Sequence, residues 1–479
     1  MSKFNNKPTG LTTNREGLPA YAMKDRAKLV TQVLTSFFNE QKFYGDNSAE
    51  MQNTIQRVIR QDADFVSRLA VYARREFNMR SVSHVLTAYL AHEPAGKPFV
   101  RRTVQGIVLR GDDVTELMAF YLSTFGKPIP NALRKGICDV FAGFDEYTLA
   151  KYKGAGKSVR MRDIVMLCHP RPVNDEQAAM WKRLLEDRLE TPVTWETELS
   201  AKGNNKETWK ALIDSGKVGY MALLRNLRNI IQAAPSNINK VWNTIGNEDA
   251  VRKSRQLPFR FLSAYKEISP VAGSRALDAL EDAVRSAMKN MPRLPGRTVI
   301  AVDASGSMSA SLSRHSTVRC CEVGMMLGLI LNRICEDSLF YTFDTTIRKY
   351  PLTRHTAILD TCVRYAAAGG GTQIGLPFEL MMQERILADR IIIISDNECN
   401  RTGPFSGGPV QKLADEYRMK TDNDIWVHAI DLMGYGTQQF TGPRTNIIAG
   451  WSEKVLQFIP LAEQGAGTLE ETIARYEWQ

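Results

Sequence analysis

Two carboxylates and three hydroxyls are spaced in this sequence as the ligands of one divalent cation would be. The candidate ligands are Asp303, Ser305, Ser307, Thr372 and Asp396. Their oxygens are hard ligands, which suit Mg²⁺ better than they suit a soft metal. The sequence therefore predicts a site for Mg²⁺ or another divalent cation. The alternative is a hydroxyl-rich loop that caps the helix after Asp303 and holds no metal.

Buried strands are expected to position these residues. Apolar runs rich in β-branched residues lie at 298–302 and 391–394, and each ends next to a candidate ligand. Gly306 lets the backbone turn tightly between the two serines, and three glycines at 369–371 precede Thr372. Since open α/β sheets bind ligands at the carboxyl ends of their strands, the three segments should meet there.

The three segments, in this order, resemble the metal-ion-dependent adhesion site of von Willebrand factor type A domains. The sequence around them alternates between strand and helix patterns, as in a doubly wound parallel sheet. Strands are expected at 298–302, 338–343, 346–350, 390–395 and 425–431. Helices are expected at 317–336, at 355–367, after Thr372 and at 409–419. We therefore predict a type A domain over residues 297–479, after a Pro- and Gly-containing boundary at 292–296.

The first part of the chain has a helical pattern almost throughout. After an irregular lead at 1–20, apolar residues recur at three-to-four spacing, with Asp62, Asp112 and Asp145 as candidate N-caps. The expected helices are 24–40, 49–60, 62–77, 81–91, 97–109, 113–125, 130–142, 174–190, 206–213 and 217–233. Short turns between helices of this length indicate antiparallel pairs. We predict a mainly α, HEAT-like solenoid over 21–292.

Basic residues are concentrated in the helical part. Residues 1–300 carry 46 Lys and Arg against 31 Asp and Glu, whereas residues 301–479 carry 16 against 21. A basic domain of this kind is typical of proteins that bind a polyanion, most often nucleic acid. The most basic segment is 151–172, which contains Lys151, Lys153, Arg160, Arg162, His169 and Arg171 together with Tyr152. Cations that neutralise phosphates, beside an aromatic ring that stacks on bases, favour an RNA site there. The alternative is a solvated charged surface.

Composition excludes several other classes. The chain has no run of about 18 apolar residues, and its first residues lack the apolar core of a secretory signal, so we expect no membrane association. Seven scattered cysteines without a CxxC pair are typical of reduced thiols, which favours a cytoplasmic location.

No group of residues commits the chain to catalysis. The segment 154–158 resembles the end of a phosphate-binding loop, but Lys151 stands where that pattern requires glycine. A nuclease using Mg²⁺ at Asp303 and Asp396 is an alternative, although one metal with hydroxyl ligands is poorly suited to two-metal cleavage. We therefore expect a binding protein and not an enzyme. Another alternative is a protein-interaction scaffold in which the metal captures a partner's carboxylate.

The combination of a basic helical module with a type A domain resembles the Ro autoantigen family, whose helical part is the TROVE module. The resemblance covers about residues 15–479 and is similar to the bacterial branch in length. It rests on 209–212 with 222–227, on the basic segment 151–172, on Arg134 with Lys135, and on the metal loops.

The resemblance implies that the helices close into a ring that the type A domain completes, as a monomer. It also implies binding of a small structured Y RNA on the outer surface and of single-stranded 3′ ends of misfolded RNA in the central hole. Such proteins act in RNA quality control, linked through Y RNA to polynucleotide phosphorylase. Lys151 and His169 match the family's outer RNA site, and Lys135 and Arg171 lie in matching basic neighbourhoods.

Overall fold

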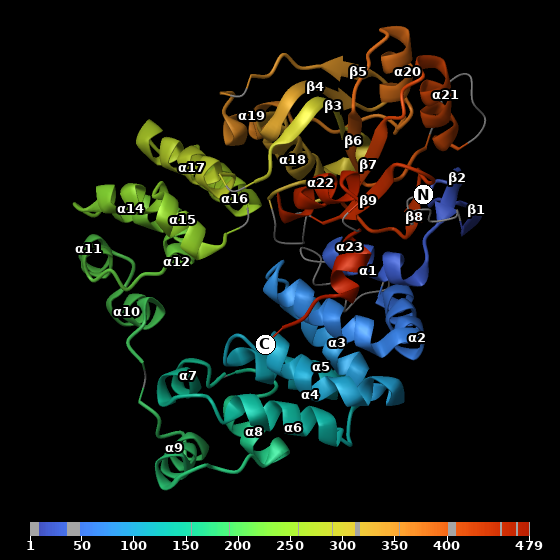
Figure 1. The fold of residues 1–479 in the computed structure, drawn as a ribbon. Helices are drawn as coiled ribbons and strands as arrows, with labels where there is room; N and C mark the ends of the chain where they lie inside the picture. Colours follow the sequence, from blue (N-terminus) through green and yellow to red (C-terminus); the bar gives the residue numbers. More distant parts are fainter. Residues whose placement is uncertain are drawn as a thin grey trace. The chain divides into compact units, whose positions relative to one another are not determined.

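The computed structural model describes residues 9–35, 48–154, 156–190, 192–256, 258–289, 291–311, 317–353, 355–400, 409–450, 453–465 and 468–478. These residues form two structural units (Figure 1). The helical unit consists of residues 25–193 together with 469–478. The α/β unit consists of residues 9–24 together with 194–468. The predicted fold class, a helical region followed by a sheet-containing type A domain, is confirmed.

The helical unit is built from stacked helices. They are α1 (Asp25–Thr35), α2 (Ser48–Arg75), α3 (Ser81–His92), α4 (Lys97–Ile107), α5 (Asp112–Phe125), α6 (Asn131–Phe141), α7 (Glu146–Lys151), α8 (Met161–Cys168), α9 (Asp175–Leu185) and α23 (Leu469–Ala474). Helix α2 packs on α4, α4 on α6 and α6 on α8, while α3 packs on α5. Contact between every second helix is the arrangement of an α-solenoid, as predicted. The predicted stretch 36–40 lies outside the described residues.

Acidic residues begin two of these helices as predicted. Asp62 interrupts α2 with φ −156° and ψ 84°, and its Oδ1 accepts the backbone N–H of Phe65 at 3.0 Å. It therefore caps a second helix within α2, which the sequence pattern placed at 62–77. Asp145 caps α7 by accepting the N–H of Thr148 at 2.8 Å. The prediction for Asp112 was wrong: α5 begins at that residue with Gly111 as its N-cap, and the neighbouring Asp113 accepts the N–H groups of Leu109 and Arg110 in the preceding turn.

The end of the chain belongs to the helical unit, not to the type A domain in which we placed it. Tyr476 accepts a hydrogen bond from Arg68 of α2 at 2.7 Å through its backbone oxygen, and its hydroxyl donates to Glu76 at 2.9 Å. The indole N–H of Trp478 donates to the backbone oxygen of Arg102 in α4 at 3.3 Å. Strand and helix periodicity cannot reveal contacts between residues about 400 positions apart.

A six-stranded sheet forms the centre of the α/β unit, in the order β5-β4-β3-β6-β7-β9 (Figure 1). The strands are β3 (Leu294–Asp303), β4 (Cys335–Phe343), β5 (Ile347–Lys349), β6 (Arg390–Ser395), β7 (Trp426–Asp431) and β9 (Thr445–Ala449). All neighbours are parallel except β4 and β5. Within this sheet, the sequence analysis predicted every strand except β9.

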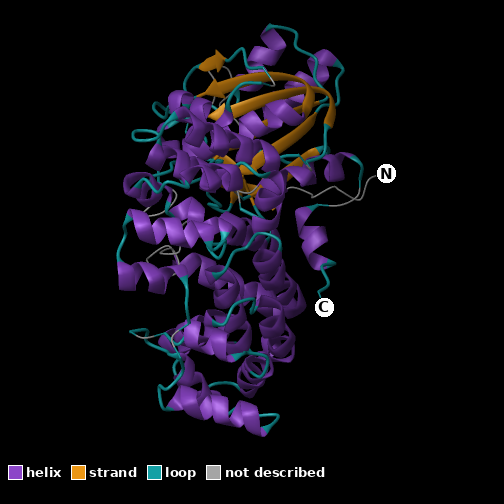
Figure 2. Ribbon diagram, turned by 90° about the vertical axis from the view of Figure 1, so that its left-hand side faces the viewer, coloured by secondary structure: helices purple, strands orange, loops and turns teal. Residues whose placement is uncertain are grey.

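Helices cover both faces of this sheet, as the doubly wound prediction requires (Figure 2). Helices α20 (Leu376–Gln383) and α21 (Gln411–Thr421) pack on the face that carries Val299, Ala301 and Ile393. Helix α18 (Cys320–Ile334) covers the other face, beside α19 (Ile358–Tyr365). A Cβ at Gly328 would lie 2.7 Å from a methyl of Val302, so only glycine lets α18 approach β3 so closely.

The α/β unit also contains the second half of the predicted helical module. These helices are α10 (Trp195–Lys202), α11 (Lys206–Asp214), α12 (Tyr220–Arg225), α13 (Leu227–Ala233), α14 (Ile238–Ile245), α15 (Glu248–Ser254), α16 (Pro258–Ile268) and α17 (Ser274–Ala287). Glu281 connects α17 to the type A fold: its carboxylate accepts the backbone N–H groups of Ile358, Leu359 and Asp360 at 2.6 to 3.2 Å. Helix α22 (Phe458–Glu463) packs against η4 (Glu453–Gln457) and β9.

Residues 9–22 are not the irregular lead that we predicted for 1–20. They form a hairpin of β1 (Thr9–Thr13) and β2 (Pro19–Ala22), and β2 pairs with β8 (Thr437–Gln438). Residues 1–8 lie outside the described part. Glycine and proline punctuation marks the turn correctly but does not show that a distant strand pairs with it. Among the helices that the structure describes, none combines the length and the apolar character needed to cross a membrane.

Candidate metal site and nucleic-acid interface

The three segments with predicted metal ligands meet at the carboxyl end of the sheet. Strands β3 and β6 are parallel neighbours, with Val302 beside Ile394, so Asp303 at the end of β3 and Asp396 directly after β6 lie at adjacent strand ends. The glycine loop joins them there. The N–H of Gly306 donates to the oxygen of Gly370 at 3.0 Å, and the N–H of Gly369 donates to Ala304 at 2.9 Å. Thr372, which follows this loop, is 1% exposed.

Hydrogen bonds fix the carboxylate of Asp303. Its Oδ1 accepts the backbone N–H of Ser305 at 2.8 Å, and its Oδ2 accepts the hydroxyl of Ser395 at 2.6 Å. The hydroxyl oxygens of Ser305 and Ser307 lie 3.1 Å apart. Ser305 is buried and Ser307 is exposed, so the pair leads from the interior to the surface. The sequence pattern did not single out Ser395, although it directly precedes Asp396.

The carboxylate of Asp396 is buried and incompletely satisfied. Its Oδ1 accepts the N–H of Glu398 at 3.3 Å, whereas its Oδ2 has no hydrogen-bond partner among the described residues. Burial raises the pKa of Asp396, and the nearby Ser307 hydroxyl lowers it in part. The Ser307 hydroxyl does not form a hydrogen bond with Oδ2. Burial and the charge of Asp396 raise the pKa of Asp303 to about 7. Two carboxylates buried this close together would repel each other if both were ionised, and a divalent cation bound between them would relieve that repulsion.

Thr372 is held beside these carboxylates by Asn400. The side-chain oxygen of Asn400 accepts the N–H of Thr372 at 2.6 Å, and the N–H of Asn400 donates to the oxygen of Thr372 at 3.1 Å. A Cβ at Gly371 would lie 2.7 Å from this Asn400 oxygen, so the third glycine permits the close approach. All five predicted ligand residues thus belong to one cluster.

This donor set fits a hard divalent cation. An orphaned carboxylate oxygen, two mutually repelling carboxylates and three hydroxyl side chains offer negative charge and oxygen ligands. Among the described residues, no group of three or more His, Cys, Asp or Glu side chains could hold a metal ion. A cation here would therefore depend on hydroxyl ligands, which excludes a soft transition-metal site.

Three of the seven predicted RNA-binding residues make ion pairs in the structure, and four make none among the described residues. Arg160 and Arg162 both lie within 3.8 Å of the Asp163 carboxylate, and Lys153 lies 3.8 Å from Asp187. Lys135, Lys151, His169 and Arg171 are exposed and have no ion pair among the described residues. Of the seven predicted RNA-binding residues, these four need not break an ion pair with a described residue to contact a polyanion, whereas the exposed pairs of the other three are weak enough to exchange for phosphate.

These four basic residues lie near the two ends of α8. Lys151 is the last residue of α7, and the loop after it folds back onto the start of α8, since the N–H of Met161 donates to the oxygen of Lys153 at 3.2 Å. His169 ends α8 in a left-handed conformation, and Arg171 follows it. Lys135 comes from α6, which contacts this end through Cys138 Sγ and the oxygen of Cys168 at 3.4 Å. Eight helical residues span about 12 Å, so the two groups can contact separate phosphates.

Aromatic rings surround one of these groups. The ammonium of Lys151 lies 5.4 Å from the ring centroid of Tyr147 and 5.5 Å from that of Tyr152. The guanidinium of Arg110 lies 5.4 Å from the same Tyr152 ring. The sequence analysis did not identify Arg110, because Arg110 is 42 positions from Tyr152 in the chain. It did not identify Tyr147 either. Arg134, beside Lys135, was also left out of the predicted set, and its buried Nε has no partner among the described residues.

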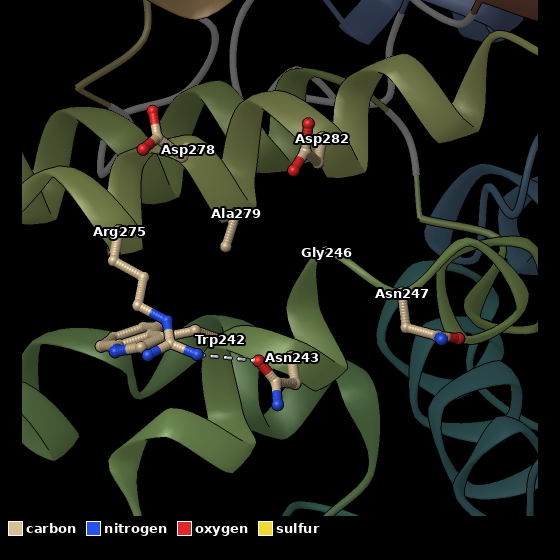
Figure 3. A pocket seen from close by; sticks show the side chains of 8 residues that line it. All are labelled: Trp242, Asn243, Gly246, Asn247, Arg275, Asp278, Ala279 and Asp282. Carbon is tan, nitrogen blue, oxygen red and sulfur yellow. Dashed lines mark hydrogen bonds between the residues drawn. The ribbon is translucent and has the colours of Figure 1, made fainter.

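A hollow between α14 and α17 lies in the α/β unit, apart from the metal ligands (Figure 3). Its volume is about 410 Å³, and Arg275 of α17 donates to Asn243 of α14 at 3.2 Å across it. Its lining is Trp242, Asn243, Gly246, Asn247, Arg275, Asp278, Ala279 and Asp282. Its lining carries two carboxylates and one guanidinium, a net negative charge that disfavours a polyanion.

Two family models match the chain. The TROVE domain matches residues 29–187 and 172–273, which together cover slightly more than half of the 479 residues. The Ro60 vWA domain matches residues 297–437. The matched type A region contains all five predicted metal-ligand residues.

Relatives and a solved structure agree with these matches. Telomerase protein component 1 is 28% identical in Rattus norvegicus and 27% in Mus musculus, each over 48% of this chain and 12% of that protein. The RNA-binding protein RO60 of Caenorhabditis elegans is 25% identical over 41% of this chain and 32% of that protein. The chain thus spans a third or less of these relatives.

The crystal structure of the Ro protein of Deinococcus radiodurans has the same fold. It matches 94% of this chain and 99% of its own, with a TM-score of 0.64 at 18% sequence identity. Together with the TROVE and Ro60 vWA matches, this shows that the chain belongs to the Ro family.

Proposed function

We propose that this chain is a non-catalytic RNA-binding protein that binds a structured RNA at the two ends of α8. The observation that supports it is the set of exposed basic side chains there, which make no ion pair among the described residues: Lys135, Lys151, His169 and Arg171. Tyr147 and Tyr152 beside Lys151 add rings on which an unpaired base can stack. The name of the Caenorhabditis elegans relative, an RNA-binding protein, agrees with this proposal.

The biological role follows the family resemblance. The structured RNA would be a small Y-type RNA, and single-stranded 3′ ends of misfolded RNA would enter the hole of a ring closed by the type A domain. Residues 194–300 carry 17 Lys and Arg against 10 Asp and Glu, which suits a second RNA surface on α10–α17. In this proposal the protein is a cytoplasmic monomer that acts in RNA quality control, linked through its RNA to polynucleotide phosphorylase.

Salt dependence tests the RNA proposal. Phosphate contacts by Lys135, Lys151 and Arg171 should give a slope of about −2.5 in a plot of log K against log salt, because each contact releases condensed counterions. The measurement is fluorescence anisotropy of a labelled RNA stem-loop titrated with the full chain at four salt concentrations. A slope near zero would mean that the basic face makes no phosphate contacts.

The metal cluster supports a second function, metal-dependent capture of a partner carboxylate by the α/β unit. The unsatisfied Oδ2 of Asp396 carries this proposal. Asp303, Ser305, Ser307, Thr372 and Asp396 would hold Mg²⁺. When bound, an ion with mostly neutral hydroxyl ligands supplies enough positive charge to accept a carboxylate from another protein. Burial of Asp303, Ser305 and Thr372 would keep these ligands away from bulk water, while the exposed Ser307 marks the open side.

Mg²⁺ is expected to stabilise the wild-type chain. At a concentration about 100-fold above its Kd, an ion that binds only the folded state adds about 2.7 kcal/mol. Differential scanning fluorimetry with Mg²⁺ and with EDTA measures this as a rise in Tm. In Asp303→Ala the rise should disappear, although this variant should still fold, because it removes one of two repelling buried charges. An equal rise in both proteins would place the ion elsewhere.

A further inference from the structure

The N-terminal turn lies against the segment that follows the metal ligand Asp396. Asn14, which is 5% exposed, donates from Nδ2 to the backbone oxygen of Cys399 at 2.6 Å. Its Oδ1 accepts the N–H of Leu18 at 2.9 Å, which closes the turn 14–18. A single buried side chain therefore both shapes the turn and attaches it to residues 396–400, which we call the ligand-bearing segment because it begins with Asp396.

Arg15 makes a second attachment beside the first. Its backbone N–H donates to Oε2 of Glu398 at 2.8 Å, and its guanidinium lies 4.4 Å from the centroid of the Tyr435 ring. Glu16, at the tip of the turn, is exposed. The turn therefore contacts, through the backbone of Arg15, the residue two positions after Asp396.

Strand pairing closes the arrangement from the other side. Tyr21 and Ala22 of β2 pair with Gln438 and Thr437 of β8. The side chain of Asn397 donates to the backbone oxygen of Thr437 at 2.8 Å. The ligand-bearing segment is therefore held between the N-terminal hairpin and the loop that carries β8.

This segment contains one of the five candidate metal-ligand residues, Asp396, and positions a second one, Thr372. Within it, the N–H of Glu398 donates to Oδ1 of Asp396 at 3.3 Å, and Asn400 binds both backbone groups of Thr372. The thiol of Cys399 also lies 3.5 Å from the oxygen of Thr372. Asn14 and Arg15 bond to Cys399 and Glu398, so a displacement of the turn would be transmitted to both Asp396 and Thr372.

We propose that the N-terminal turn 14–18 is a structural part of the metal site, so that docking of the turn and binding of a divalent cation strengthen each other. This inference rests on the proposed metal site. Asn14 is a positioning residue: it acts through the ligand-bearing segment and does not touch the ion. Because coupling between two binding events is reciprocal, the cation must hold the turn as strongly as the turn favours the cation.

Mn²⁺ binding to the full chain tests the first direction. Asn14→Ala should raise the Kd for Mn²⁺, measured by electron paramagnetic resonance, about fivefold to tenfold, a typical size for coupled sites. Thr12→Ala is the matched control, because Thr12 is an exposed residue of the same hairpin, and its Kd should equal that of the wild type. The proposal would be overturned if the Asn14→Ala protein has the wild-type Kd for Mn²⁺ although its turn 14–18 no longer packs on the ligand-bearing segment.

Hydrogen exchange of the wild-type chain tests the reverse direction without that variant. Exchange of amides in residues 9–22 should slow when Mg²⁺ is added and should not respond in Asp303→Ala. If the wild-type chain binds Mn²⁺ but the exchange rates of residues 9–22 do not change with Mg²⁺, the coupling is contradicted and the metal site is not. A wild-type chain that binds no Mn²⁺ would instead overturn the metal site, and this inference with it.

Discussion

Replacing Asp113 with asparagine is expected to lower the free energy of unfolding of the helical unit by about 3–5 kcal/mol. Asp113 is fully buried, and its carboxylate lies 3.1 Å from Arg74, 2.5 Å from Arg80 and 3.2 Å from His84. It also accepts the N–H groups of Leu109 and Arg110 at 2.9 Å. Its removal would leave the buried guanidinium of Arg74 without its partner, which is the costly way to break a buried ion pair.

Urea unfolding of the full chain, with hydrogen exchange to locate the loss in α2, α3 and α5, measures this effect. Asp139→Asn is the matched control, because Asp139 makes a bidentate pair with Arg101 at the surface of the same unit. Exposed pairs contribute about 0–1 kcal/mol, so the control should be nearly neutral. Equal effects of the two substitutions would show that the buried cluster is not the main support of α2, α3 and α5.

The same cluster predicts how stability depends on pH. Burial alone would raise the pKa of Asp113, but His84, Arg74 and Arg80 together hold it well below its usual range. A lowered folded-state pKa adds stability above the ordinary aspartate pKa of about 4, and this stability is lost as the pH falls further. The helical unit of Asp113→Asn should therefore lose less stability than the wild type between about pH 4 and pH 2.

The double charge reversal Lys151→Glu with Arg171→Glu is expected to weaken binding of structured RNA about 100-fold. Each substitution replaces an attraction to phosphate by a repulsion, and the two positions lie at opposite ends of α8. The salt slope should become shallower by about 1.5 to 2, because two counterion-releasing contacts are lost. Anisotropy titrations of one labelled stem-loop measure both quantities.

A control of equal charge separates this effect from bulk electrostatics. Lys97→Glu with Lys127→Glu changes the charge by the same amount at exposed positions of the helical unit outside α7 and α8. Its effect on affinity should be several-fold smaller, because long-range interactions are screened beyond about 10 Å at 0.1 M salt. If both double variants bind RNA equally weakly, the ends of α8 are not the binding site.

The convergence of the five candidate metal-ligand residues was predictable because it depends on sequence patterns that are only a few residues long. A buried parallel strand that ends in a carboxylate can be read from a few residues, and two such strands must place their ends on the same edge of a sheet. Asp303 and Asp396 illustrate this, since β3 and β6 are neighbours in the structure. Thr372 follows because three glycines leave its hydroxyl free to approach.

Features that depend on distant partners could not be predicted. Lys153 appeared unpaired in the sequence, yet it lies 3.8 Å from Asp187, which is 34 positions further along the chain. The N-terminal hairpin pairs with β8, more than 400 positions away, so no periodicity within residues 9–22 reveals it. The partners of the buried Asp113 come from α2 and α3 and were likewise hidden.

The most direct test of the central claim is ultraviolet cross-linking of the full chain to RNA in its native cells, followed by sequencing of the RNA and mapping of the attached peptides. We predict one abundant small structured RNA attached within residues 131–172, with other RNA 3′ ends attached to α10–α17. RNA recovery no greater than that of the Lys151→Glu, Arg171→Glu protein would contradict the claim that the basic surface of the helical unit binds RNA.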